Sequence, residues 1–108
     1  MRQTNHFGET VRTKRKILKL TGTSLASTIA ISQSYISNME KGITVPPSSA
    51  VIDRLEKILK FPPGELFVAS FKDGVERLPP LDNSEAWQYF WNCVQQLKKN
   101  KRVEGVQK

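Results

Sequence analysis

The chain has 108 residues, of which 38% are apolar and 25% are charged, and its net charge is +7. This composition is typical of one folded domain with room for an additional helix, and the length excludes barrel enzymes and dinucleotide-binding enzymes with a separate substrate domain. No apolar run approaches the ~20 residues of a membrane span, and the first residues lack the apolar segment of a signal peptide. We therefore expect a cytoplasmic protein with no membrane partner.

Basic residues are concentrated near the two ends of the sequence. Residues 2–19 hold six basic residues and one acidic residue, residues 98–108 hold five and one, and the stretch between them has a net charge of −2. Clusters of this kind favour a polyanionic partner, with nucleic acid as the leading candidate. A solvated, solubilising surface is the alternative explanation.

Three proline pairs divide the sequence, because proline ends a helix that precedes it and can begin one that follows it. Apolar residues recur at helical spacing between these pairs. Ser32 is a favoured helix N-cap, Gly42 is a favoured C-terminal stop, and Ser48 or Ser49 can cap the helix after the first pair. The pattern predicts five helices, over 7–20, 23–29, 33–41, 51–59 and 64–67.

The sequence after residue 69 has a different character. A turn around Asp73-Gly74 makes a small hairpin conceivable, but a linker is the prediction for this segment. A final helix is expected from about Glu85 to Lys99. The predicted organisation is a helical domain over 1–69, a linker over 70–83, an oligomerisation helix over 84–100 and a basic tail over 101–108.

The predicted helices over 23–29 and 33–41 are joined by a tight turn and form the unit of greatest functional interest. Ala26 supplies the small residue that two closely crossing helices need. Ile36 and Met39 give the second helix a face toward the core. Short polar residues at the start of that helix can project into the major groove of DNA.

Several segments follow one known pattern in order: Val11-Arg12, Arg15, Leu20-Thr21, Leu25-Ala26, Ile36–Gly42, Leu55–Leu59 and Glu65–Phe67. At this spacing, residues 7–67 resemble the lambda-repressor-like (Cro/CI, XRE) helix-turn-helix family. The resemblance implies an all-α fold, in which a five-helix DNA-binding domain is followed by a C-terminal helix. It also implies a sequence-specific regulator of transcription that binds double-stranded DNA.

The resemblance implies roles for residues of the 33–41 helix and its surroundings. The positions at which family members contact base edges are occupied by Gln33, Ser34, Ser37 and Asn38. The positions that contact the phosphate backbone are occupied by Ser32, Tyr35, Lys41 and Thr44. Glutamine and asparagine can both bind adenine through N6 and N7, whereas an exposed polar face without a partner is the alternative explanation.

The resemblance also implies a structural pair, Arg15 with Glu40, which would join the first helix to the 33–41 helix; a phosphate contact by Arg15 is the alternative. The chain departs from the family at Gly22, which replaces a glutamine that supports DNA contact, and at Ala30 and Lys60, which replace glycines. We expect a slightly different turn at Ala30, because a left-handed backbone is unfavourable for alanine.

Five apolar residues recur at three- and four-residue spacing along the final helix: Trp87, Phe90, Trp91, Val94 and Leu97. We expect this stripe to form a homodimer interface, which would place two recognition helices ~34 Å apart on a near-palindromic operator. Packing of the stripe on residues 1–69 and contact with a different protein are the alternatives. Cys93, beside the stripe, is expected to be half-buried.

No catalytic, metal-binding or cofactor-binding set is recognisable in the sequence. One histidine, His6, and one cysteine do not make a usual zinc site, and Asp53 and Glu56 are expected on a solvated helix surface. We therefore expect no enzyme, no metal and no cofactor, but a dimeric repressor at the nucleoid. The alternatives are an antitoxin-like or antirepressor-controlled protein whose final helix binds another protein, and a structural nucleoid or RNA-binding module.

Overall fold

The computed structural model describes the backbone of residues 5–106 and the side chains of residues 5–97. The described residues form helices and no strand, so the predicted all-α fold is confirmed and the hairpin around Asp73-Gly74 is not formed there. The helices are α1 (His6–Ile17), α2 (Gly22–Ile29), α3 (Gln33–Lys41), α4 (Ser49–Ile58), α5 (Glu65–Lys72) and α6 (Ser84–Val106). None of the described helices has the length and apolar character needed to cross a membrane.

Side-chain caps fix where α2, α3 and α6 begin. The hydroxyl of Thr21 accepts a hydrogen bond from Ser24 N at 3.0 Å, and that of Ser32 accepts one from Tyr35 N at 3.1 Å. The carboxamide oxygen of Asn83 accepts from Ala86 N in the first turn of α6. Such caps satisfy backbone N–H groups that have no partner within the helix. The predicted bounds of the 33–41 helix are therefore confirmed.

The turn between α2 and α3 differs from the prediction. Ala30 adopts the left-handed conformation, with φ 60° and ψ 45°, so the turn keeps the geometry that a glycine would favour. Lys19 and Lys60, which lie just after the ends of α1 and α4, also have a positive φ. Ile31 N donates to Ala26 O at 3.0 Å and closes the turn. The expectation of a different turn was wrong, because this hydrogen bond and the burial of Ile29 hold the strained alanine in place.

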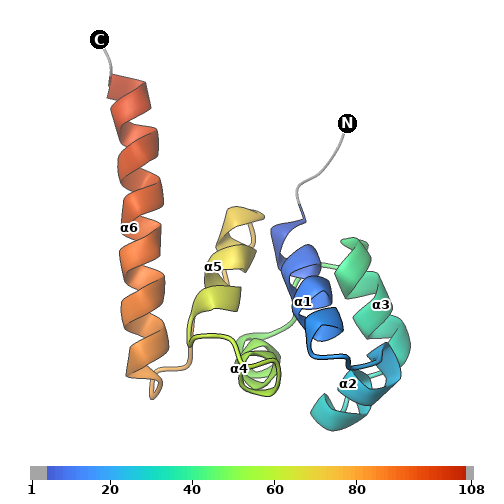
Figure 1. Ribbon diagram of the computed structural model, residues 1–108. Helices are drawn as coiled ribbons and strands as arrows, with labels where there is room; N and C mark the ends of the chain where they lie inside the picture. Colours follow the sequence, from blue (N-terminus) through green and yellow to red (C-terminus); the bar gives the residue numbers. More distant parts are fainter. Residues whose placement is uncertain (1–4, 107–108) are drawn as a thin grey trace.

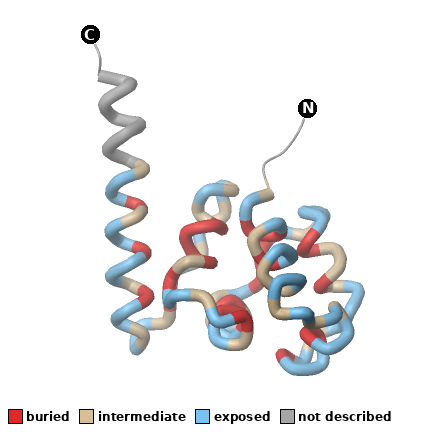
Figure 2. Tube along the Cα trace, viewed as in Figure 1, coloured by how far each residue is buried: buried red, intermediate tan, exposed pale blue. Residues whose placement is uncertain are grey.

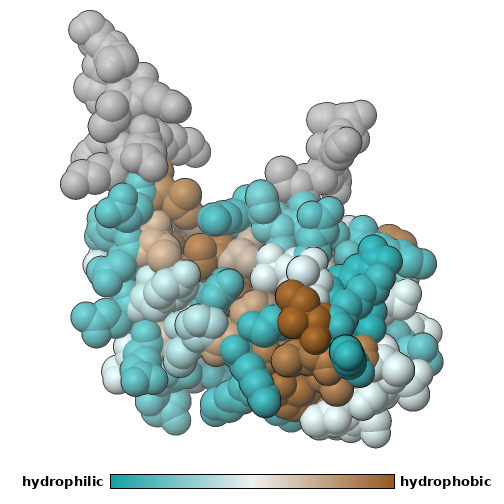
Figure 3. Space-filling model, viewed as in Figure 1, coloured by the Kyte–Doolittle hydropathy of each residue, from teal (hydrophilic) through white to brown (hydrophobic). Residues whose placement is uncertain are grey.

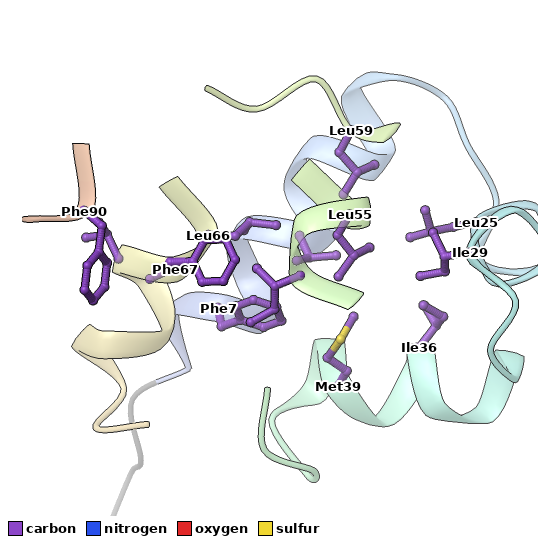
Figure 4. Close-up of a cluster of buried hydrophobic side chains, with 14 of the residues drawn as sticks. Phe7, Leu25, Ile29, Ile36, Met39, Leu55, Leu59, Leu66, Phe67 and Phe90 are labelled. Atoms are coloured by element: carbon purple, nitrogen blue, oxygen red, sulfur yellow. The ribbon is translucent and has the colours of Figure 1, made fainter. Parts of the chain in front are cut away.

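The core lies where α1 to α5 converge (Figure 4). Each helix contributes buried apolar residues, which include Phe7, Val11, Leu25, Ile29, Ile36, Met39, Ile52, Leu55, Leu59, Leu66 and Phe67. Because the apolar faces of five short helices meet at one cluster, this cluster fixes the orientation of α3 relative to the rest of the domain.

The helices are arranged so that α1 packs on α3 and α5, and α5 packs on α4 and α6 (Figure 1). The long helix α6 stands beside α5 and extends past it. It runs to Val106, beyond Lys99, where we expected the helix to end, so helical backbone includes most of the predicted 101–108 tail. The side chains from Lys98 onward lie outside the described residues.

The segment expected as a linker is attached to the domain. Residues 70–72 belong to α5, and the Asp73 carboxylate accepts hydrogen bonds from His6 N at 2.7 Å and Phe7 N at 2.9 Å at the start of α1. Farther along, the Arg77 guanidinium donates to the carbonyl oxygens of Pro46 and Pro47. The helical domain therefore includes residues beyond the boundary we placed at 69.

The apolar stripe of α6 is divided between the core and the surface. Phe90 and Val94 are buried, with exposed fractions of 3% and 4%. The buried positions of α6 lie on the side of the helix that faces α5 (Figure 2). Trp87 and Leu97 are half-buried, and Trp91 is 53% exposed. Phe90 also makes edge-to-face contacts with Phe71 and Trp87. Phe90 and Val94 therefore complete the chain's own core, which was the alternative given for this stripe, and they are not free to form the expected homodimer interface.

Candidate nucleic-acid interface

The helix α3 has one buried side and one polar side. Ile36, Met39 and Glu40 are buried, which orients the helix toward α1 and α2. The residues expected to contact bases lie on the other side: Gln33 and Ser34 are exposed, and Ser37 and Asn38 are half-buried. Positions i, i+3 and i+4 are neighbours on a helix surface. Ser34, Ser37 and Asn38 therefore share one face, and Gln33 stands at its N-terminal end.

The residues expected to contact phosphates are distributed around this face. Ser32 and Lys41 are exposed at the two ends of α3, and Tyr35 is half-buried at its side. Thr44 differs, because its hydroxyl oxygen is buried and has no hydrogen-bond partner among the described residues. The structure therefore brings Ser32, Tyr35 and Lys41 to the surface beside the residues expected to contact bases, but it does not bring the Thr44 hydroxyl there.

An ion pair joins α1 to α3. Arg15 Nε donates to Glu40 Oε2 at 2.7 Å and Arg15 Nη2 donates to Glu40 Oε1 at 2.9 Å. The third hydrogen bond, from Nη1, goes to the carbonyl oxygen of Leu20 at 2.9 Å. The hydrogen bond with Glu40 raises the pKa of Arg15 above its usual value. Three of the five guanidinium N–H groups of Arg15 therefore have partners inside the domain, which is the arrangement expected of a structural pair.

Two residues near the N-terminus, Asn5 and Gly8, also contact the C-terminal end of α3 and were not found from the sequence. Asn5 donates from its carboxamide nitrogen to Glu40 O at 3.0 Å, and its carboxamide oxygen accepts from Gly8 N. A Cβ atom at Gly8 would meet the carbonyl oxygen of Met39 and would lie 2.7 Å from that of Glu40. Asparagine just before a helix and glycine in its first turn are the local patterns that indicate a cap and a close approach.

The basic cluster of residues 2–19 lies largely on the surface within its described part. Arg12, Lys16 and Lys19 are exposed on and just after α1. In Figure 3 hydrophilic side chains cover much of the visible face, and an apolar patch interrupts them where α1 and α4 lie in Figure 1. The surface around α1 therefore offers positive charge to a polyanion, in addition to the polar face of α3.

The start of α2 is open to solvent at the departure from the family pattern. Nothing lies within 4 Å of the position that a Cβ atom would take at Gly22. Thr21 and Thr23 on either side are exposed. A longer side chain at Gly22 would therefore fit without displacing any neighbour, and the missing glutamine leaves this helix start without a long polar side chain.

Glu56 is buried, although we expected it on a solvated helix surface. Its side chain turns to the start of α5, where Oε1 accepts from Gly64 N at 3.0 Å and Oε2 accepts from Leu66 N at 2.8 Å. Burial raises the pKa of Glu56 from its usual 4.5 to about 7, although these backbone hydrogen bonds lower it and the nearby Asp53 raises it. Glu56 therefore caps α5 and has no access to a substrate.

Comparison with known protein families places part of the chain in one of them. Residues 11–66, from within α1 to the beginning of α5, match a protein-family model described as a helix-turn-helix. This match covers more than half of the chain. Searches of curated proteins and of solved structures found no match to the chain.

Proposed function

The chain belongs to the helix-turn-helix family of the Cro/CI, XRE type, whose domain binds DNA and serves regulation rather than catalysis, and on this premise we propose that it is a sequence-specific transcriptional repressor acting at the nucleoid. In this proposal α3 enters the major groove of double-stranded DNA. Two copies bind a near-palindromic operator, because a two-fold protein dimer matches a two-fold DNA site.

The observation that carries the proposal is the polar outer face of α3. Gln33 is exposed at the first position of the helix, and Asn38 lies beyond the first turn. Each carboxamide can donate to N7 and accept from the N6 amino group of adenine, a pairing worth ~1–3 kcal/mol of discrimination. Ser34 and Ser37 lie between them and can bond to any base edge. We propose that these four residues read the sequence.

Ser32, Tyr35 and Lys41 are proposed to bind phosphates on the two strands that border the groove. Contacts of this kind set the position of α3 but carry no sequence information. Thr44 joins them only when its hydroxyl rotates outward from the position in which it is buried. The Arg15–Glu40 pair is proposed to act structurally, by holding α3 at a fixed angle to α1.

Repression is explained most simply by occupancy of the promoter by the bound protein. A small domain bound across a promoter excludes polymerase from the same DNA, and this requires no catalytic group or cofactor. Two linked half-sites also increase the affinity of the pair well beyond that of one domain, because the second domain binds at a high effective concentration.

The experiment begins with selection of binding sites for the full chain from random duplexes. The affinities for the selected site and for a scrambled duplex are then compared by gel shift at several salt concentrations. We expect the selected site to bind at least ~10³-fold more tightly. Asn38→Ala should reduce this ratio, and Gln96→Ala, which changes an exposed residue of α6, should not. Equal affinity for the two duplexes would contradict the proposal and favour a structural nucleoid role.

A further inference from the structure

The loop between α3 and α4, residues 42–48, has few hydrogen bonds of its own. Its first residues close the end of α3, where Ile43 N and Thr44 N donate to Asn38 O at 2.9 and 3.4 Å. Beyond Thr44, as far as Pro47, no backbone group pairs with another backbone group among the described residues. Because proline has no N–H to donate, the second half of the loop depends on side chains from elsewhere for its conformation.

Arg77 provides the hydrogen-bond donors that the loop lacks. Its Nε donates to Pro47 O at 2.9 Å, and its Nη2 donates to Pro46 O at 3.0 Å. Both prolines are buried, and a buried carbonyl oxygen without a donor is costly. Because the guanidinium donates from one rigid plane, Arg77 also fixes the two carbonyl groups relative to each other.

Arg77 belongs to a segment that is itself attached to the domain on both sides. Earlier in the segment, the Asp73 carboxylate accepts hydrogen bonds at the start of α1. Later in the segment, Asn83 Nδ2 donates to Asp53 Oδ1 of α4 at 3.1 Å. The segment lies outside residues 11–66, which match the family model. Arg77 therefore contacts the loop from a fixed position that is not part of the matched helix-turn-helix.

The loop lies at the edge of the proposed DNA interface. Lys41, an exposed residue proposed to bind a phosphate, immediately precedes it. Tyr35, which is half-buried at the side of α3 and is also proposed to bind a phosphate, lines one shallow hollow together with Pro46 and Arg77. Arg77, the loop and Tyr35 therefore meet at one place on the surface.

We propose that Arg77 is a positioning residue of the DNA interface, which fixes the α3–α4 loop before binding so that the Tyr35 hydroxyl is held ready for a phosphate. The proposal rests on the proposed function, in which Tyr35 contacts the DNA backbone. A loop that becomes ordered only on binding subtracts the entropy of its ordering from the affinity. A loop already fixed by Arg77 avoids this loss, and Arg77 itself need not contact the DNA.

A direct contact between Arg77 and a phosphate is the competing explanation, and substitution by lysine separates the two. Arg77→Lys keeps the positive charge, so it would preserve a phosphate contact and the dependence of affinity on salt. The lysine ammonium is a flexible point charge and does not reproduce the planar fork that holds both carbonyl oxygens. A loss of affinity with an unchanged salt slope therefore indicates positioning.

Gel shift of the full chain with its selected duplex measures this loss, at a temperature at which circular dichroism shows each variant to be folded. Arg77→Lys should weaken binding by about fivefold, the cost of ordering a side chain and its surroundings on binding. Arg54→Lys is the matched control and should change the affinity by less than about twofold, because Arg54 is exposed on α4 and makes no hydrogen bond to the loop in the described structure. Wild-type affinity in Arg77→Lys would overturn the proposal, and so would equal losses in the two variants.

A double-mutant cycle tests whether Arg77 acts through Tyr35. Tyr35→Phe removes only the hydroxyl that is proposed to meet a phosphate. In that background Arg77→Lys should cost less than about twofold in affinity, because no contact remains to be positioned. A residue with a merely structural role would have the same effect in both backgrounds, and this result would contradict the proposal.

Amide hydrogen exchange reports on the loop in the absence of DNA. Ile43 N donates to Asn38 O at the entrance to the loop, whereas Ile36 lies on the buried side of α3. Arg77→Lys should accelerate exchange several-fold at Ile43 and leave it unchanged at Ile36, because only the loop loses its support. Unchanged exchange at Ile43, or an equal increase at both positions, would show that Arg77 does not fix the loop.

Failure of this proposal is distinguishable from failure of the proposed function. If the chain selects a DNA site and Arg77→Lys binds it as tightly as the wild type, the positioning role is wrong and the repressor function stands. If the wild type binds selected and scrambled duplexes equally but Arg77→Lys weakens binding to both, the positioning role stands and sequence-specific repression is wrong.

Discussion

The guanidinium of Arg15 and the carboxylate of Glu40 face each other through two hydrogen bonds of 2.7 and 2.9 Å. The two residues are 25 positions apart and belong to α1 and α3. Their side chains are 14% and 7% exposed. Because the pair is shielded from water and bidentate, each partner compensates for the desolvation of the other.

Arg15→Ala should therefore destabilise the domain by ~3 kcal/mol or more, since it leaves the Glu40 carboxylate shielded without its partner. In urea unfolding of the four proteins of a double-mutant cycle with Glu40→Ala, we expect a coupling energy above ~0.5 kcal/mol. Sequence preference for DNA should change little in any variant that remains folded. Additive losses would show that the pair does not act as a unit.

Replacement of Ala30 by glycine should stabilise the protein by ~0.5–1 kcal/mol. Ala30 is exposed and has φ 60°, so the substitution relieves backbone strain and removes no buried contact. Thermal or urea unfolding measures the gain. Ala50→Gly is the matched control, because Ala50 is exposed in the right-handed backbone of α4 and should lose ~0.5–1 kcal/mol when substituted. A loss of stability in both variants would contradict the strain at Ala30.

The stability of the domain should depend on the protonation of Glu56. Its pKa is about 7 in the folded protein and 4.5 when unperturbed, so the folded state binds this proton more readily. The resulting stabilisation, at most ~3 kcal/mol, is fully present below pH 4.5 and is lost as the pH rises through 7. Urea unfolding between pH 4.5 and 8.5 should show the wild type losing stability relative to Glu56→Gln, which cannot titrate. A wild type that gains stability relative to Glu56→Gln as the pH rises would mean that the hydrogen bonds from Gly64 and Leu66 outweigh the cost of burial.

Lys41 should contribute to affinity without contributing to specificity. It is exposed at the C-terminal end of α3, where a phosphate contact is proposed. Lys41→Ala should weaken binding to selected and scrambled duplexes by the same factor and reduce the slope of log K against log salt by ~0.9. Lys72→Ala removes the same charge from α5, which α1 separates from α3 (Figure 1), and should leave the slope unchanged. Equal slopes for both variants would remove Lys41 from the interface.

Local patterns were sufficient to predict the helices that carry the site. Ser32 and Gly42 define the bounds of α3 through a cap and a left-handed stop, both of which depend on neighbouring residues alone. The exposure of Gln33 and the burial of Ile36 follow from helical periodicity. These features were predictable because the interactions that determine them span only a few residues.

Features that depend on contacts between segments far apart in the sequence were not predictable in this way. Asp73 caps α1 from more than sixty positions away, and Glu56 is satisfied only because the start of α5 lies beside it. Periodicity placed Phe90 and Trp91 on one apolar stripe of α6, but it contains no information about which of the two meets α5. Only the three-dimensional packing separates the buried row of α6 from the exposed one.

The central claim, that α3 reads base edges in the major groove, is tested most directly by replacing single atoms of the DNA. Each adenine of the selected site is replaced in turn by 7-deazaadenine, which lacks the major-groove acceptor N7. The account predicts one adenine per half-site at which this change weakens binding of the wild type by about tenfold, equivalent to ~1.4 kcal/mol. The same change should have no further effect on Gln33→Ala or on Asn38→Ala, whichever residue contacts that base. A site at which no adenine N7 matters, or at which wild type and both variants lose affinity equally, would contradict this reading of adenine by α3.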